Sequence, residues 1–262
     1  MKIHRSRLIL CLGLLGGLVT SVIASTPSPV QSTLRPLGLP IVKQVQLSGS
    51  DSQSQAFEAV KAGYQKTCAA KLPEGVAFTG EALNQLDPQR LYFMFDYAPR
   101  VYFLAEGACY TDALGATIAT AATPTNTPLK GNTFTIFPST HCSLSTVCST
   151  GSGNRTQAEP LLSGDFVQLP TVKAGQQLQF FLMANMDSSG KPADTYYNGT
   201  TTNPDDFQHM IAFFPDNNSQ YIIIGFEDMY GGGDKDCNDV LYVVDVGPNN
   251  AALFRNPNTL PR

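Results

Sequence analysis

Five carboxylate residues fall within thirteen positions near the end of the chain: Glu227, Asp228, Asp234, Asp236 and Asp239. Lys235 is the only cation among them, and Asn238 adds an amide oxygen. Carboxylates this close together repel one another unless a cation lies between them. Hard oxygen ligands without a nearby pair of His or Cys residues favour Ca²⁺ over zinc or copper. The stretch therefore predicts a calcium site.

The simplest alternative is an acidic, solvated hairpin loop. Asp234, Asp236 and Asn238 alternate, however, so in an extended segment their side chains share one side. An EF-hand is excluded because Asp239 stands where that loop requires glycine, and a strand-like run follows in place of a helix. We expect Asp228, Asp234, Asp236 and Asp239 to bind one ion, or two, with Asn238 completing the shell. Glu227 is a further candidate ligand, although adjacent side chains in an extended chain point apart.

Two apolar runs, Tyr221–Phe226 and Val240–Val246, flank this loop, and Gly231–Gly233 can adopt the positive φ values of a tight turn. A helix is predicted over Asp51–Ala70, ended by Pro73, and a hairpin over Gln208–Phe226. The remaining predicted strands are Leu91–Phe95, Val101–Ala105, Asn132–Phe137, Asp165–Leu169 and Gln177–Ala184. Eight short strands and one N-terminal helix indicate an all-β fold, an antiparallel β-sandwich of jelly-roll type.

The first 24 residues are typical of a secretory signal peptide. Lys2, Arg5 and Arg7 precede the apolar run Leu8–Val19, and Val22–Ala24 resembles a cleavage site. Removing it leaves 14 Lys and Arg against 21 Asp and Glu, a net charge of −7, which argues against nucleic-acid binding. We expect an exported protein, periplasmic, surface-located or secreted, with no membrane span after cleavage. The predicted parts are a signal peptide (1–24), a flexible leader (25–50), a helical extension (51–85), the β-sandwich (86–247) and a tail (248–262).

The cysteines agree with export. Cys11 leaves with the signal peptide, so five remain: Cys68, Cys109, Cys142, Cys148 and Cys237. In an oxidising compartment they should pair and leave one over. Cys142 and Cys148 close a short loop and are the pair we expect to form a disulfide. The sequence does not choose among the other three.

Several blocks resemble an exported bacterial family of unknown function. Its closing motif combines GFED, a glycine run and D-x-D-x-N-D, which here reads Gly225–Asp228, Gly231–Gly233 and Asp234–Asp239. Ala105–Gly115 and Phe180–Asn185 resemble two further blocks, as do the shorter elements Thr195–Tyr197 and Gln208–Met210. The resemblance implies a β-sandwich module of exported or surface proteins, sometimes within adhesins, with a calcium-binding acidic loop and no known reaction. Cys109 and Cys237 both depart from the family's motifs, which suggests that they pair.

We therefore favour a calcium-binding module with a binding, adhesion or cell-surface role, whose partner is an unknown protein or glycan. Tyrosines on the predicted strands could line such a face, although tyrosines in sheets more often serve packing. A secreted hydrolase using two carboxylates is the alternative from another class. It is disfavoured because the mature chain has two histidines, His141 and His209, and no G-x-S-x-G or H-E-x-x-H motif. A purely structural envelope protein is the third possibility.

Overall fold

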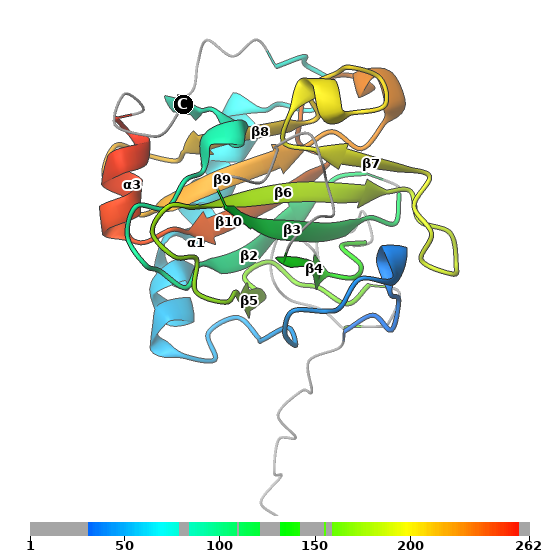
Figure 1. The fold of residues 1–262 in the computed structure, drawn as a ribbon. Helices are drawn as coiled ribbons and strands as arrows, with labels where there is room; N and C mark the ends of the chain where they lie inside the picture. The colour runs from blue at the N-terminus through cyan, green and yellow to red at the C-terminus, as the bar shows by residue number, and fades with distance from the viewer. Residues whose placement is uncertain are drawn as a thin grey trace, which may run out of the picture.

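The computed structural model describes residues 31–78, 84–108, 110–120, 132–141, 155 and 159–256. In this part of the chain, two antiparallel sheets pack face to face as a β-sandwich (Figure 1). One sheet has six strands in the order β1-β8-β9-β10-β2-β5, and the other has four in the order β4-β3-β6-β7. A helix precedes the strands and a short helix follows them.

The elements follow one another along the chain with these bounds. The two helices are α1 (Ser52–Lys71) and α3 (Pro248–Phe254). The strands are β1 (Asn84–Leu86), β2 (Arg100–Glu106), β3 (Ala113–Thr120), β4 (Asn132–Phe137), β5 (Phe166–Gln168), β6 (Gln176–Ala184), β7 (Asp194–Tyr197), β8 (Met210–Phe214), β9 (Tyr221–Phe226) and β10 (Val240–Asp245). Short 3-10 turns lie at Pro36–Gly38, Pro88–Arg90, Thr200–Thr202 and Tyr230–Gly232.

The central strands of the six-stranded sheet are buried on both faces. Along β9, Ile222 and Ile224 face the core between the sheets, whereas Ile223 faces α1. Strands covered on both sides have continuous apolar sequences, in contrast to the alternation of a half-exposed sheet. This explains why β9 and β10 are apolar at nearly every position.

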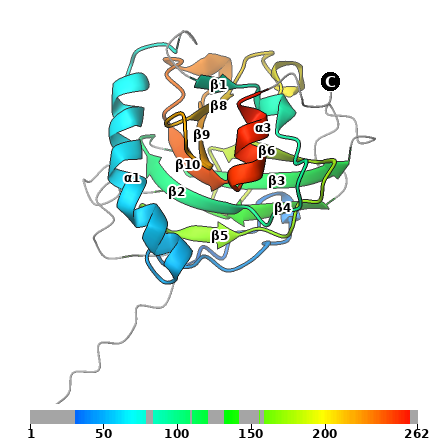
Figure 2. The ribbon, with the colours of Figure 1, turned by 90° about the vertical axis from the view of Figure 1, so that its left-hand side faces the viewer.

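Helix α1 covers the outer face of this sheet, as Figure 2 shows. Asp51 caps its N-terminus by accepting a hydrogen bond from the Ser54 N–H at 2.8 Å, and the Ser54 hydroxyl is 3.0 Å from the Asp51 N–H. Phe57 is fully buried and stacks on Tyr102 of β2, with ring centroids 3.9 Å apart. The predicted helix is therefore confirmed, and its apolar side fixes it on β2.

Parts of the fold differ from the sequence-based expectations. The predicted strand Leu91–Phe95 contains a single β-bridge, from Tyr92 to Gln177. Strands β1, β3 and β7 were not expected, and α3 lies in the predicted tail. Part of the predicted flexible leader also packs on the sandwich, because Ile41 bridges to Thr135 and Gln46 to Phe166.

The structure describes two of the five remaining cysteines. Cys68 and Cys237 are buried free thiols, and no disulfide is found among the described cysteines. The free thiol of Cys237 gives no support to its pairing with Cys109, which the family resemblance suggested, and Cys109 lies outside the described residues. Cys237 lies in the apolar layer under α1, where a thiol behaves as a small hydrophobic side chain. Cys142 and Cys148 lie outside the described residues.

Candidate metal centre

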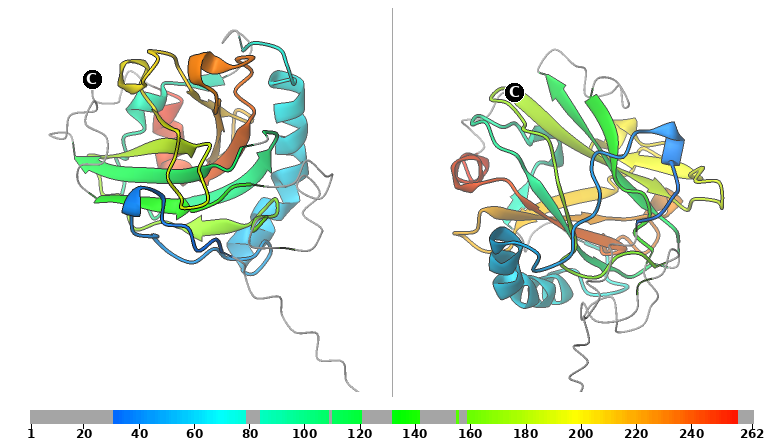
Figure 3. Two further views of the ribbon diagram at one scale, coloured as in Figure 1. Left: turned by 90° about the vertical axis from the view of Figure 1, so that its right-hand side faces the viewer. Right: turned by 90° about the horizontal axis from the view of Figure 1, so that it is seen from below.

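The acidic loop joins β9 to β10 at one end of the six-stranded sheet. Phe226 and Val240 are the last paired residues of the two strands, so residues 227–239 project from the end of the sheet. The loop lies near the C-terminal end of α1 (Figure 3). Its base is closed by the Asp228 N–H, which donates to Asp239 Oδ2 at 2.8 Å, and by the Glu227 N–H, which donates to the His209 carbonyl at 2.9 Å.

Five residues of this loop have positive φ angles: Gly231, Gly232, Gly233, Lys235 and Cys237. Gly233 is required for a second reason, since a Cβ at this position would lie 2.4 Å from Glu227 Oε1. The predicted role of the glycine run is confirmed: it turns the chain back over the carboxylates.

The structure divides the predicted ligands into two groups. Glu227, Asp228 and Asp239 each place a carboxylate oxygen within 4.8 Å of the others. Asp234 and Asp236 instead lie with Glu74, a residue from the segment that follows α1. We call Glu74, Asp234 and Asp236 the outer acidic group.

A fourth carboxylate, Asp112 from the segment between β2 and β3, lies beside Asp228. Burial is the main cause of the raised pKa of Asp228, and the charge of Asp112 raises that pKa further. We call Asp112, Glu227, Asp228 and Asp239 the buried acidic centre. Asp112 is fully buried, and the exposed fractions of Glu227 and Asp228 are 1% and 3%. One oxygen of each of these three side chains has no hydrogen-bond partner: Asp112 Oδ2, Glu227 Oε2 and Asp228 Oδ2.

Burial and mutual repulsion raise the pKa values of these carboxyl groups. Burial is the larger cause and raises the pKa of Asp112 to about 7, of Glu227 to about 8 and of Asp228 to about 9. Burial also raises the pKa of Asp239. Carboxylates placed this way are costly without a positive charge among them, and each orphaned oxygen has lost its contact with water.

The outer acidic group is more exposed than the buried acidic centre, and its buried member, Asp236, has hydrogen-bond partners for both carboxylate oxygens. Glu74 and Asp234 are exposed, and Asp236 is buried. Both oxygens of Asp236 accept backbone hydrogen bonds, from Asn238 at 3.0 Å and from Gly75 at 2.8 Å. The predicted ligand Asn238 donates its side-chain amide to the Leu72 carbonyl at 3.1 Å. Asp236 and Asn238 thus fasten the acidic loop to the end of α1.

His209 is also part of the architecture around the loop. It is fully buried and stacks on Tyr196, with ring centroids 3.6 Å apart. Its two ring nitrogens lie 2.8 Å from Asp205 Oδ2 and from the Glu227 carbonyl oxygen. These contacts hold the start of the loop in place.

Sequence reasoning missed Asp112 and Glu74. Asp112 lies between two apolar runs, and an acidic residue in that position is the signal that could have marked it. Glu74 follows the helix-ending Pro73 and carries no local signal. Both reach the loop only through the tertiary fold.

Comparison with known proteins agrees with part of the expected resemblance. Residues 172–247 match a family model described as "Domain of unknown function (DUF4114)". This match runs from just before β6 to just after β10, and so includes the whole acidic loop. No curated protein and no solved structure matches the chain. Among the described residues, no helix is long and apolar enough to cross a membrane.

Proposed function

We propose that the buried acidic centre holds a calcium ion and that the chain is a calcium-stabilised β-sandwich module. One observation carries the proposal: Asp112, Glu227 and Asp228 are at least nine-tenths buried, and each has a carboxylate oxygen without a hydrogen-bond partner. Asp228 links them, because it lies beside Asp112 and also clusters with Glu227 and Asp239. A water-filled site could satisfy such oxygens, but it would leave their mutual repulsion in place. A divalent cation satisfies the oxygens and also cancels the repulsion between the carboxylates. Carboxylate oxygens are among the ligands that Ca²⁺ prefers.

The ion is held by Asp112, Glu227, Asp228 and Asp239, and backbone carbonyls of the loop complete its shell. The sequence predicted one ion or two. A second ion would bind at the outer acidic group, with Asn238 as a further ligand. Asp112 comes from a segment remote in sequence, so the ion ties the β2–β3 connection to the β9–β10 loop. Its primary role is therefore to stabilise this end of the sandwich.

Such a module serves binding, adhesion or surface interaction outside the cytoplasm, and it is not an enzyme. Export rests on the charged and apolar layout of residues 1–24. A hydrolase is disfavoured because Glu227 and Asp228 are enclosed, with exposed fractions of 1% and 3%, which leaves no room for a substrate between them.

Thermal melting of the chelator-stripped chain tests the metal proposal. Millimolar Ca²⁺ should raise the melting temperature, and equal Mg²⁺ should raise it less, because Mg²⁺ demands a tighter octahedral shell and dehydrates reluctantly. Identical melts in calcium and in chelator would refute the proposal. Capture of partners from the organism's own envelope, with and without EGTA, then tests whether binding needs the ion.

A further inference from the structure

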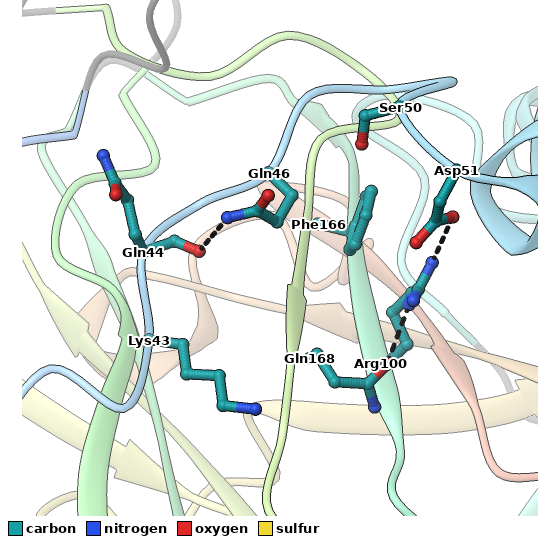
Figure 4. Close-up of a pocket in the computed structure, with 8 residues that line it drawn as sticks. All are labelled: Lys43, Gln44, Gln46, Ser50, Asp51, Arg100, Phe166 and Gln168. Carbon is teal, nitrogen blue, oxygen red and sulfur yellow. Dashed lines mark hydrogen bonds and ion pairs between the residues drawn. The ribbon is translucent and has the colours of Figure 1, made fainter.

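A polar pocket lies at the opposite end of the six-stranded sheet from the acidic loop. Its volume is about 460 Å³, and it is lined by Lys43, Gln44, Gln46, Ser50, Asp51, Arg100, Phe166 and Gln168 (Figure 4). We call it the Arg100 pocket. Arg100 and Glu106 begin and end β2, so the strand geometry places the pocket about 20 Å from the acidic loop. The volume falls within the range of roughly 300–1,000 Å³ that is usual for small-molecule sites.

The guanidinium of Arg100 is held rigidly at the base of this pocket. It donates from Nη1 to Asp51 Oδ1 at 2.8 Å and from Nε to Gln168 Oε1 at 3.1 Å, and it lies 4.1 Å from the centroid of the Phe166 ring. The Gln168 amide is fixed in turn, because it donates to the Ala98 and Pro99 carbonyls. A guanidinium has five N–H groups, and the Tyr102 hydroxyl is a third partner, so two donors remain in a fixed orientation.

Lys43 adds a second positive charge to the pocket. It reaches from the segment before α1 toward Gln168 (Figure 4), and within the described part of the chain its ammonium group contacts no carboxylate. Asp51 is already paired with Arg100. The pocket therefore has one net positive charge, on a chain whose formal net charge is −4.

The rest of the lining is suited to hydroxyl groups. Gln44, Gln46 and Ser50 present amides and a hydroxyl, and Phe166 is almost fully covered by its neighbours. Amides and hydroxyls both donate and accept hydrogen bonds, as the hydroxyl groups of a sugar do. The lining is more polar than apolar, which favours a ligand rich in hydroxyl groups over an apolar peptide.

We propose that the Arg100 pocket binds an acidic saccharide, a sugar unit that carries a carboxylate. The carboxylate lies between Lys43 and the free donors of Arg100, and the sugar hydroxyls bond to Gln44, Gln46 and Ser50. This site lies outside residues 172–247, which match the family model, and it does not depend on the metal centre.

Calorimetric titration of the full chain with a galacturonic-acid trimer tests this proposal. The trimer should bind, and its methyl ester, which lacks the charge, should bind more weakly. Lys43→Gln should reduce affinity for the trimer roughly three- to tenfold and remove the preference for the acid over the ester. Gln46→Ala should weaken both ligands. Lys191→Gln, which removes an exposed lysine outside the pocket, should change neither.

Three outcomes would overturn the proposal. They are equal binding of trimer and ester, no binding of the trimer at millimolar concentration, and binding of acetate or of an acidic peptide as tight as that of the trimer. Titrations in EGTA should give the same affinities as those in calcium. A failure here is therefore distinguishable from a failure of the metal centre.

Discussion

Replacing Asp112 by asparagine separates the cost of the buried carboxylate from its value as a metal ligand. The asparagine carbonyl can still accept the Asn185 N–H, which donates to Asp112 Oδ1 at 2.8 Å. Its new amide can donate to the neighbouring Asp228, where two carboxyl groups previously repelled each other. The calcium-free variant should therefore be no less stable than the wild type.

In calcium, the same change should cost most of the stabilisation. Loss of one charged ligand removes about 1.5–3 kcal/mol, which weakens Kd roughly ten- to 150-fold. At a calcium concentration of about 100 times the wild-type Kd, the wild type gains about 2.7 kcal/mol. A variant that binds about 30-fold more weakly gains about 0.9 kcal/mol at this concentration. For a domain of this size, the shifts in melting temperature are roughly 5–11 °C and roughly 2–4 °C.

Calorimetric melts of both proteins, with and without calcium, measure these shifts. Asp236→Asn is the matched control, because both oxygens of Asp236 accept backbone N–H groups and an amide can accept only one of them. It should destabilise the protein by about 1–3 kcal/mol with or without calcium, and leave the calcium shift at the buried acidic centre intact. An Asp112→Asn protein with an undiminished calcium shift would refute the assignment of Asp112 as a ligand.

Three further predictions concern the loop, its charge and the helix. Gly233→Ala should cost about 1–3 kcal/mol of stability and weaken calcium binding, because the added Cβ would displace the Glu227 side chain. Gly231→Ala is the control, since its Cβ would meet open space, and it should leave calcium binding unchanged. Without calcium, the melting temperature should fall from pH 5 to pH 9. The folded protein raises the pKa of Glu227 to about 8 and that of Asp228 to about 9, so at low pH both carboxyl groups are protonated and the fold is at its most stable. This stability is lost as the pH rises and the two groups ionise. Saturating calcium should make the melting temperature less dependent on pH. An unchanged dependence would contradict calcium binding at the buried acidic centre. Phe57→Ala should cost about 3–5 kcal/mol equally in calcium and in chelator; a calcium-dependent cost would contradict its placement.

Much of the sandwich could be predicted because its central strands are buried on both faces. Continuous apolar runs gave β9 with its observed bounds and β10 to within one residue. Strand β3 was missed because its residues are small: Ala113, Gly115 and Ala116 have low strand preference alone. Gly115 belongs there because the Phe181 ring of β6 lies against it, where a Cβ would be 2.3 Å from the ring. That reason exists only in the folded protein.

The candidate site could be predicted in composition but not in grouping. Residues 227–239 contain most of the carboxylates, so local sequence was sufficient to find the loop. The division into two groups depends on Asp112 and Glu74, which approach from other elements. The expectation that Glu227 points away from Asp228 assumed an extended chain, whereas the structure places a carboxylate oxygen of each within 4.8 Å of the other.

Isothermal titration of chelator-stripped protein with calcium is the most direct measurement of the central claim. The buried acidic centre predicts a heat of binding in the wild type, a proton release that grows as the pH falls from 9 to 7, and loss of the tight site in Asp228→Asn. The same experiment with Asp234→Asn should retain that site, because Asp234 belongs to the outer acidic group. Absence of any heat of binding in the wild type, or an Asp228→Asn protein that binds calcium as tightly, would contradict the claim.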